Sequence, residues 1–357
     1  MKRKKLVIIF LIICFVVVVL LLKPKNPSFN IMGLNETNRI CQIGDDYYYT
    51  EKDGVYRYGE SEPFIKTDES ILLASYNDCF YVCNSGNGNI KMYTTKGEMI
   101  DEIDLDTAIT CFTVYNDSVI YVDDEKKLYI QNEWVAINLS ETEVIYSKIS
   151  DFHCFKYEKF DGVSIYSKES NNSIFHYIDR NSGYIPFAEE NFFIVSDSTN
   201  RSDVSFYKYI KEDMSCQGSV MLPIANYIPF YVQTVSDKII YVATSEPLDP
   251  HVSRIEARQL KYHIEDSVLI IDADSLEIEK HHETKKYERI LYADTEKAIT
   301  YYKGNYCTYS MSDWKLLEKQ SAREIKNGGS YSFEVCGDLL FVFDDETDEL
   351  INSLNLS

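Results

Sequence analysis

The side chains best suited to recognising a charged ligand lie in one basic segment of an otherwise acidic chain. This segment, residues 245–265, interrupts a run of apolar stretches and carries five cationic or imidazole groups: His251, Arg254, Arg258, Lys261 and His263. Guanidinium and ammonium groups bind carboxylates and phosphates through charge-assisted hydrogen bonds. The segment therefore predicts a docking site for an anionic ligand or an acidic partner surface. A short amphipathic helix that packs Ile255 and Tyr262 against its neighbours is the alternative interpretation.

Two further motifs contain residue types that bind metals. His281-His282-Glu283 places two imidazoles side by side, but neighbouring residues of a strand point to opposite faces, so a solvated strand edge is favoured. The acidic run 344–349 offers the oxygen ligands that calcium prefers. It lacks the glycine of a calcium loop and lies where a hairpin turn is expected, so the turn is favoured. We predict no bound cofactor and leave calcium open at this run.

Motifs of known catalytic chemistry are missing from the sequence. It contains no Gly-x-Ser-x-Gly nucleophile elbow, no phosphate-binding loop and no His-Glu-x-x-His helix. His153 and His176 stand alone in strand-like stretches and are expected to be core or edge residues. The sequence therefore favours a binding protein over an enzyme.

The amino terminus predicts a membrane anchor. Residues 6–22 form an apolar run of seventeen residues that follows the basic tail 1–5 and precedes Lys23 and Lys25. In helical form such a run spans roughly 25 Å, the short end of what crosses a bilayer. The run is longer than a usual signal-peptide core and no Ala-x-Ala-like site follows it, so an uncleaved anchor is favoured over a cleaved signal peptide.

More basic residues precede the apolar run than follow it, which predicts a cytoplasmic amino terminus and an extracellular remainder. The expected organisation is a cytoplasmic tail (1–5), a single transmembrane helix (6–22), a linker (23–38) and an ectodomain (39–357) in a bacterial cell membrane. Beyond Lys25 the chain carries 30 Lys and Arg against 57 Asp and Glu, a net charge of −27. So acidic a domain is expected to stay soluble and monomeric and to repel nucleic acid and anionic lipid.

A short phrase recurs along the ectodomain. It consists of a polar or acidic residue and an apolar-aromatic burst, and the clearest copies span 77–82, 116–122, 236–242 and 337–342. Their spacing of roughly thirty to forty-six residues is typical of repeat architectures. Hairpins follow the phrases, as in 267–278, and an abundance of Tyr and Phe favours strands. Only 250–263 and 316–325 could form helices.

The Tyr81-Val82, Tyr121-Val122 and Tyr241-Val242 strand ends, together with the hairpin around Asp272, resemble the β-propellers of the YVTN and quinoprotein-like class. The resemblance covers residues 40 to 357 and implies an all-β fold with seven or eight blades. The blade tryptophan of quinoprotein repeats is missing, which argues against a quinone cofactor. We expect the last blade to borrow strands from residues 29–44, including Arg39-Ile40-Cys41-Gln42-Ile43.

The resemblance implies little about function, because propellers host many activities. The favoured function is a binding module for a partner protein or a cell-wall glycan at the cell surface. The alternative is a surface hydrolase or lyase that cleaves glycans with carboxylates at the central channel. Cys79 and Cys83, four apart in one strand-like stretch, are too far apart to bridge each other, and both interblade disulfides and buried free thiols remain open for the others.

Overall fold

The computed structural model describes residues 28–31, 39–67, 71–115, 118–124, 128–132, 135–138, 153–158, 162–167, 173–176, 186–188, 192–200, 203–210, 215–223, 228–244 and 265–357. These residues form 31 strands in eight sheets and contain no helix. No helix in these ranges could therefore cross a membrane. The predicted span 6–22 and the predicted helix 250–263 lie outside the described residues.

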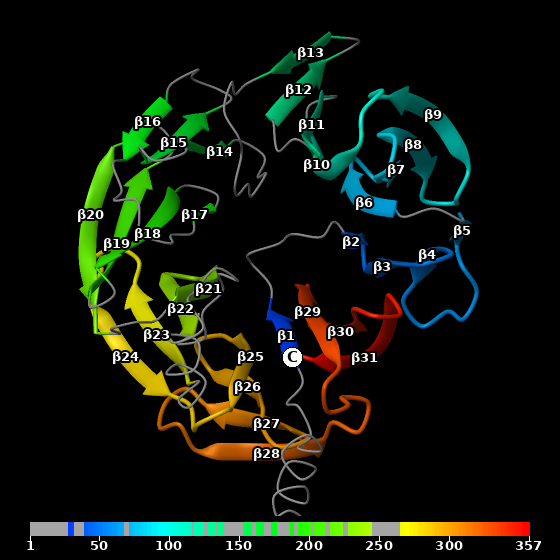
Figure 1. The fold of residues 1–357 in the computed structure, drawn as a ribbon. Helices are drawn as coiled ribbons and strands as arrows, with labels where there is room; N and C mark the ends of the chain where they lie inside the picture. The colour runs from blue at the N-terminus through cyan, green and yellow to red at the C-terminus, as the bar shows by residue number, and fades with distance from the viewer. Residues whose placement is uncertain are drawn as a thin grey trace, which may run out of the picture.

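The sheets follow one another around a ring, and each sheet runs from an inner strand near the axis to an outer strand at the rim (Figure 1). The first four sheets, from the inner strand outward, are β2 (Ile40–Ile43), β3 (Asp46–Glu51), β4 (Gly54–Arg57) and β5 (Ile65–Lys66); β6 (Ile71–Tyr76), β7 (Cys79–Asn84), β8 (Asn89–Thr94) and β9 (Met99–Asp104); β10 (Ile109–Tyr115), β11 (Ser118–Asp123), β12 (Leu128–Asn132) and β13 (Val135–Asn138); and β14 (His153–Glu158), β15 (Gly162–Ser167) and β16 (Ser173–His176).

The last four sheets repeat this order. They are β17 (Pro186–Ala188), β18 (Phe192–Asn200), β19 (Asp203–Ile210) and β20 (Cys216–Leu222); β21 (Ile228–Val235), β22 (Lys238–Thr244), β23 (Asp266–Asp272) and β24 (Ile278–Glu283); β25 (Arg289–Ala293), β26 (Lys297–Tyr301), β27 (Asn305–Ser310) and β28 (Leu316–Ser321); and β1 (Ser28–Ile31), β29 (Ser330–Cys336), β30 (Leu339–Asp344) and β31 (Glu349–Asn355).

The recurring phrase forms the hairpin between the first and second strands of a sheet, and in the last sheet, where β1 adds at the inner edge, the hairpin between β29 and β30. Its polar residues occupy the tight turn, where Asn77 and Asp78 both have positive φ, as the two-residue turns of hairpins require. Ser236 and Gly337 have positive φ at the matching positions. The apolar burst that follows becomes the buried second strand, as in β7 and β22. The recurring phrase therefore predicted these hairpins and the buried strands that follow their turns.

The core lies between neighbouring sheets. Aliphatic side chains of β22 and β23 pack against those of β25 and β26 in one continuous cluster that includes Ile240, Val268, Ile270, Ile290 and Ile299. A second cluster joins the first two sheets through Tyr48, Val55, Leu73 and Phe80. No sheet buries both of its faces alone, so the ring is the unit of stability.

The expected exchange between the amino-terminal residues and the last sheet is confirmed in part. β1, inside the predicted linker 23–38, adds to the last sheet, and it runs parallel to β29 at its inner edge with Ser28 opposite Ser330. The strand expected from Arg39-Ile40-Cys41-Gln42-Ile43 was wrong, because β2 pairs with β3 in the first sheet. The helix considered for 316–325 was wrong. Residues 316–321 form strand β28, because their backbone pairs with β27 and this pairing outweighs the helix propensity of Leu316 to Gln320.

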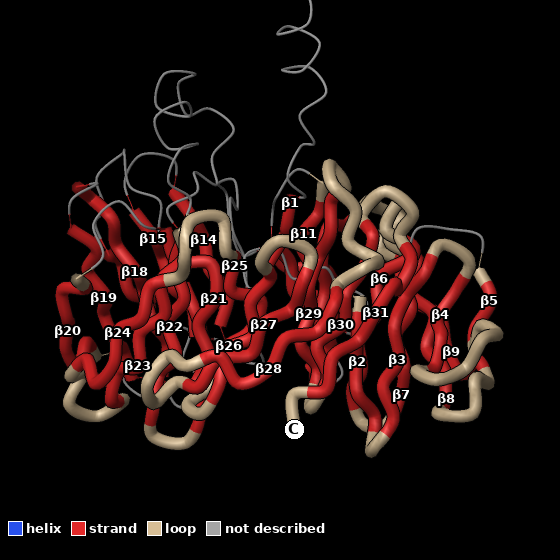
Figure 2. The backbone as a smooth tube through the Cα atoms, turned by 90° about the horizontal axis from the view of Figure 1, so that it is seen from below, coloured by secondary structure: helices blue, strands red, loops and turns tan. Residues whose placement is uncertain are grey.

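The two ends of the described chain leave from opposite faces of the ring. β31 is antiparallel to β30, which is antiparallel to β29, so β31 runs in the same direction as β1. β1 therefore begins at one face, here called the N-terminal face, and the chain ends at the other, the C-terminal face (Figure 2). In the last sheet, the connection into β29 and the turn between β30 and β31 lie on the N-terminal face, where the Asp345 amide donates to the Ser330 carbonyl. In the other sheets, which have no added inner strand such as β1, the equivalent positions are the connection into the first strand and the turn between the second and third strands.

Candidate binding site at the root of the 245–264 segment

The described structure fixes where the basic segment leaves the ring. The flanking strands β22 and β23 end and begin with the register partners Thr244 and Asp266, both fully buried. The predicted binding residues between them, His251, Arg254, Arg258, Lys261 and His263, lie outside the described residues. Because this is a turn between second and third strands, the segment leaves from the N-terminal face, the face at which β1 begins.

A buried ion pair stabilises this root. One carboxylate oxygen of Asp266 accepts a bond of 3.0 Å from Arg289 Nε and one of 2.7 Å from the Ile290 amide. Burial raises the pKa of Asp266, and the positive charge of Arg289 opposes that rise. The pair joins β23 of one sheet to β25 of the next. Separating these two strands would leave a buried charge without its partner, which costs free energy of folding.

The connection between β24 and β25 is joined to the same root by further hydrogen bonds. The Thr284 hydroxyl accepts from the Asp266 amide at 2.8 Å and donates to the Glu288 carbonyl at 3.0 Å. Glu288 in turn accepts from the Thr300 hydroxyl at 2.7 Å. These groups are buried, and buried polar groups require such partners. The backbone on both sides of the segment is therefore held in one orientation.

The two adjacent histidines of β24 each have a protein partner. His281 Nε2 lies 2.7 Å from the Ser267 hydroxyl, and burial lowers its pKa. His282 Nε2 lies 3.0 Å from the Met311 carbonyl, and its ring stacks on Trp314 with 4.8 Å between centroids. In the described part of the chain no group of three or more His, Cys, Asp or Glu side chains could hold a metal ion. The strand edge was expected to be solvated. Both imidazoles are instead half-buried and packed against protein groups.

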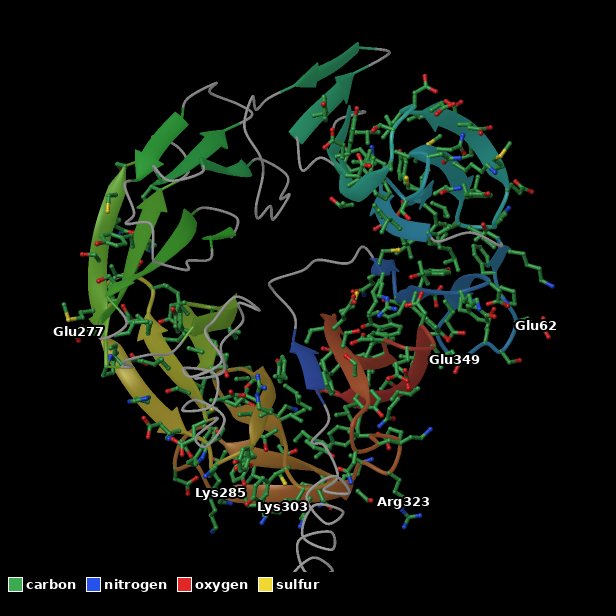
Figure 3. All side chains as sticks on the ribbon, viewed as in Figure 1. Glu62, Glu277, Lys285, Lys303, Arg323 and Glu349 are labelled. Atoms are coloured by element: carbon green, nitrogen blue, oxygen red, sulfur yellow. The ribbon has the colours of Figure 1, made fainter. Side chains whose placement is uncertain are left out.

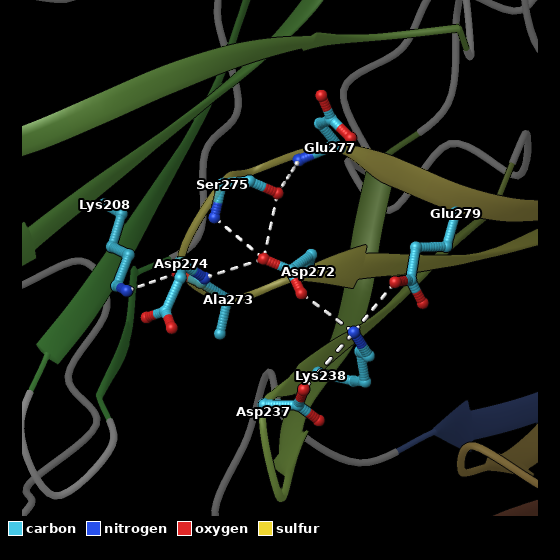
Figure 4. Close-up of polar contacts among 9 residues, drawn as sticks. All are labelled: Lys208, Asp237, Lys238, Asp272, Ala273, Asp274, Ser275, Glu277 and Glu279. Atoms are coloured by element: carbon cyan, nitrogen blue, oxygen red, sulfur yellow. Dashed lines mark hydrogen bonds and ion pairs between the residues drawn. The ribbon is translucent and has the colours of Figure 1, made fainter.

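On the C-terminal face, charged side chains bond to one another and to the backbone of a hairpin turn (Figure 4). Lys238 Nζ lies 2.8 Å from both Asp272 Oδ2 and Glu279 Oε1. The other oxygen of Asp272 accepts from the amide and the hydroxyl of Ser275, at 2.8 and 2.9 Å. The Lys238 bond and these turn bonds hold the pKa of Asp272 well below its usual range. The predicted hairpin 267–278 is confirmed, and its carboxylates serve the fold.

The acidic run 344–349 also forms a turn. The Asp344 carboxylate accepts from the amides of Glu346 and Thr347, at 2.9 and 3.2 Å, in the connection between β30 and β31. The favoured turn is therefore confirmed. The described cysteines 41, 79, 83, 216, 307 and 336 are free thiols.

Sequence reasoning missed the buried charges at the root. Asp266, Glu288 and Arg289 stand at the ends of strongly apolar strands, where a solvated position is the usual expectation. The only signal was the position of Glu288 and Arg289 immediately before the apolar stretch 290–293. Neither the pairing across two sheets nor the burial can be read from that position.

Comparison with known proteins supports the fold. No protein-family profile matches the sequence, and no curated protein matches it significantly. Solved structures do match. BamB from Moraxella catarrhalis has a TM-score of 0.55 and 8% sequence identity, and the match covers 91% of this chain and 96% of that one. The computationally designed Ika8 protein has a TM-score of 0.57 and 8% sequence identity, and the match covers 93% of this chain and 100% of that one. The ring of radial sheets, together with these two matches over nearly the whole chain, shows a β-propeller fold.

Proposed function

We propose that this β-propeller is a membrane-anchored extracellular binding module, with eight blades of the YVTN-like kind, that recognises a partner protein or a cell-wall glycan. The observation that carries the proposal is the rigid root at Thr244 and Asp266. The buried pair of Asp266 and Arg289 and the strand pairing of Asp266 with Thr244 give the cationic segment a fixed base. Loops placed in this way on a rigid scaffold are where binding residues concentrate.

The proposed contact residues are His251, Arg254, Arg258, Lys261 and His263. A partner with exposed carboxylates or phosphates would match their charge. Because the segment leaves from the face at which β1 begins, and residues 6–22 are proposed to anchor the chain, the partner would be bound on the side of the ring nearest the membrane. A cell-wall glycan would have to offer acidic groups on the same side.

The binding proposal is tested by capture from envelope extracts with the full chain in detergent micelles. The variant R254E/R258E/K261E reverses three charges of the segment, and K96E/K315E/K319E reverses three exposed lysines on the C-terminal face and rim. We expect the first variant to lose at least one specifically captured protein or glycan and the second to retain it. Equal capture by both variants, or no specific capture by the wild-type chain, would overturn the proposal.

The proposed location is tested separately. Alkaline carbonate extraction of membranes should leave the full chain in the membrane pellet, and protease added to intact cells should digest the propeller. Release of the chain by carbonate would exclude the anchor, and protection from protease in intact cells would exclude the outside location.

A further inference from the structure

An unusual concentration of positive charge lies on the connections around the sheet β25–β28. The connections 284–288, 302–304 and 322–329 lie on the N-terminal face and contain Lys285, Lys286, Lys303 and Arg323, which we call the basic cluster. The same connections also contain the exposed Lys326, the half-buried Glu324 and the buried Glu288. Three of the four residues of the basic cluster are exposed, and Lys286 is half-exposed. Among the described residues none of them makes an ion pair, although the chain has 57 acidic residues to offer.

Aromatic rings gather these cations into one place. Lys285 Nζ and Lys303 Nζ flank the same ring, 5.7 and 4.9 Å from the centroid of Tyr302. Lys286 Nζ lies 5.1 Å from the centroid of Tyr287, whose side chain is 40% exposed. Figure 3 shows Lys285, Lys303 and Arg323 along one stretch of the rim.

A backbone bond brings Arg323 to the same place. The Ala322 amide donates to the Gly304 carbonyl at 3.0 Å. Arg323, which follows Ala322, therefore lies beside Lys303, which precedes Gly304. Three separate connections thus converge on one cationic and aromatic surface. Tyrosine and lysine both combine an apolar body with a polar tip, which suits a boundary between water and lipid.

The position of β1 determines what this surface faces. Ser28 begins β1 at the N-terminal face, and only residues 23–27 separate it from the apolar run 6–22. Five residues span at most about 18 Å when extended. If residues 6–22 cross the bilayer, the N-terminal face therefore lies within about 20 Å of the lipid headgroups, and the C-terminal face points away.

We propose that the basic cluster binds the headgroups of anionic phospholipids, so that the propeller rests on the membrane through the sector β25–β28; this rests on the membrane anchor of the proposed function. The net charge of the domain does not prevent the contact, because at physiological salt charges beyond about 8 Å are largely screened. Each basic residue near an anionic surface strengthens binding about five-fold.

The contact is confined to one sector of the face. In the adjacent turn 345–348, Asp345 accepts from the hydroxyls of Ser330 and Ser332, and Asp348 pairs with Arg39. The exposed Glu346 would be repelled by anionic lipid. We therefore expect the ring to tilt, with β25–β28 nearer the bilayer than β29–β31.

The test uses the full chain reconstituted in vesicles of phosphatidylcholine, with or without phosphatidylglycerol, and a membrane-impermeant amine reagent read at each lysine by mass spectrometry. Phosphatidylglycerol should slow labelling of Lys285 and Lys303 at least about five-fold, and high salt should reverse this. Labelling of Lys96 and Lys315 on the C-terminal face should not change. Equal labelling of both pairs in both vesicles would overturn the lipid proposal.

Charge-reversal variants provide the matched control. K285E/K303E should abolish the protection of Lys286 by phosphatidylglycerol, and K96E/K315E should leave it intact, with thermal unfolding showing that both fold. Loss of protection in neither variant would contradict the proposal. Protection of Lys286 by an acidic protein from envelope extracts, but not by phosphatidylglycerol, would replace lipid with a protein partner.

Carbonate extraction of the same vesicles separates the two proposals. A retained chain with unprotected lysines overturns only the lipid contact. A released chain overturns the anchor, and with it the lipid contact as stated here.

Discussion

Two junctions between neighbouring sheets are built from different chemistry. Where β29–β31 meets β2–β5, here called the seam, the contact is aromatic: Phe341 and Phe343 are fully buried against Tyr49 and Tyr56. Where β21–β24 meets β25–β28, here called the polar junction, an aliphatic core surrounds the buried pair of Asp266 and Arg289. The seam joins residues nearly three hundred positions apart, whereas the polar junction joins neighbours in sequence.

Each chemistry suits its task. Aromatic rings at the seam lie 5.7 to 6.3 Å apart in stacked and tilted arrangements, as for Tyr49 with Tyr56, Phe341 and Phe343. Such packing supplies much buried area with little demand on direction. Arg39 then fixes the register of the seam through a 3.0 Å bond to the Ser332 hydroxyl and by lying over the Phe343 ring. The hydrogen bonds at the polar junction are directional, so they can fix the orientation of the connection between β24 and β25 and of the root of the 245–264 segment.

Removing one charge should expose the largest difference between the two junctions. We expect Arg289→Ala to lower the free energy of unfolding by about 3–5 kcal/mol, because it leaves the Asp266 carboxylate buried without its cation. Urea denaturation measures the loss. The double variant D266N/R289L removes both charges and should recover much of the stability; a double variant as unstable as R289A would show that packing, not charge, holds this junction.

At the seam the loss should follow volume and not charge. Phe341→Ala should cost about 3 kcal/mol through the cavity it leaves between the first and last sheets. Phe341→Leu should cost less, and Tyr47→Phe, which removes only a half-buried hydroxyl, should cost little. A penalty for Tyr47→Phe as large as that for Phe341→Ala would mean that the seam depends on hydrogen bonds.

Thiol labelling distinguishes the junctions without unfolding the protein. Burial raises the pKa of Cys336 to about 11, and this thiol packs against the seam cluster. Near pH 8 it should react with iodoacetamide roughly 100-fold more slowly than the exposed Cys216. In the Phe341→Ala variant the labelling of Cys336, read by mass spectrometry, should accelerate, while that of Cys307 does not. Equal acceleration of both thiols would mean that the whole ring loosens as one unit.

Acid should lower the stability of the protein by a small amount through Asp272, which lies on the C-terminal face of the sheet β21–β24. Asp272 has a folded-state pKa below its ordinary value of 3.8, so its contribution to stability is present above pH 3.8 and is lost as pH falls through the folded value. Urea midpoints should show wild type more stable than Asp272→Asn at pH 6, with the difference shrinking below pH 3.8. Glu277→Gln, an exposed carboxylate of the same turn, is the control and should show no such trend.

The local features of this structure, its turns and buried strands, could be predicted from the sequence. The polar residue at Asn77-Asp78 and the apolar burst after it encode a turn and a buried strand, and both follow from neighbours in the chain. The closure of the ring could not be read in this way, because Ile40–Ile43 alternates equally well for pairing with β3 or with the last sheet. Leu316 to Gln320 likewise favours a helix until β27 is available as a partner.

Charge was the least predictable property. Counting acids and bases gave one net charge for the ectodomain, and from it an expected repulsion of anionic lipid. Within the ranges that the structure describes, the fold leaves Lys285 and Lys303 without an ion pair and places both beside the ring of Tyr302, while Asp345 and Asp348 have partners of their own. This arrangement depends on which connections lie side by side, and the closure of the ring determines that.

The parallel pairing of β1 with β29 has a consequence for synthesis. Ser28 leaves the ribosome some three hundred residues before its partner Ser330, an interval of many seconds at about 5–20 residues per second. During that interval the inner edge of the final sheet does not yet exist, and residues 28–31 must wait unpaired while seven other sheets form. A message truncated before codon 330 would therefore yield an open arc of sheets that quality-control proteases could recognise.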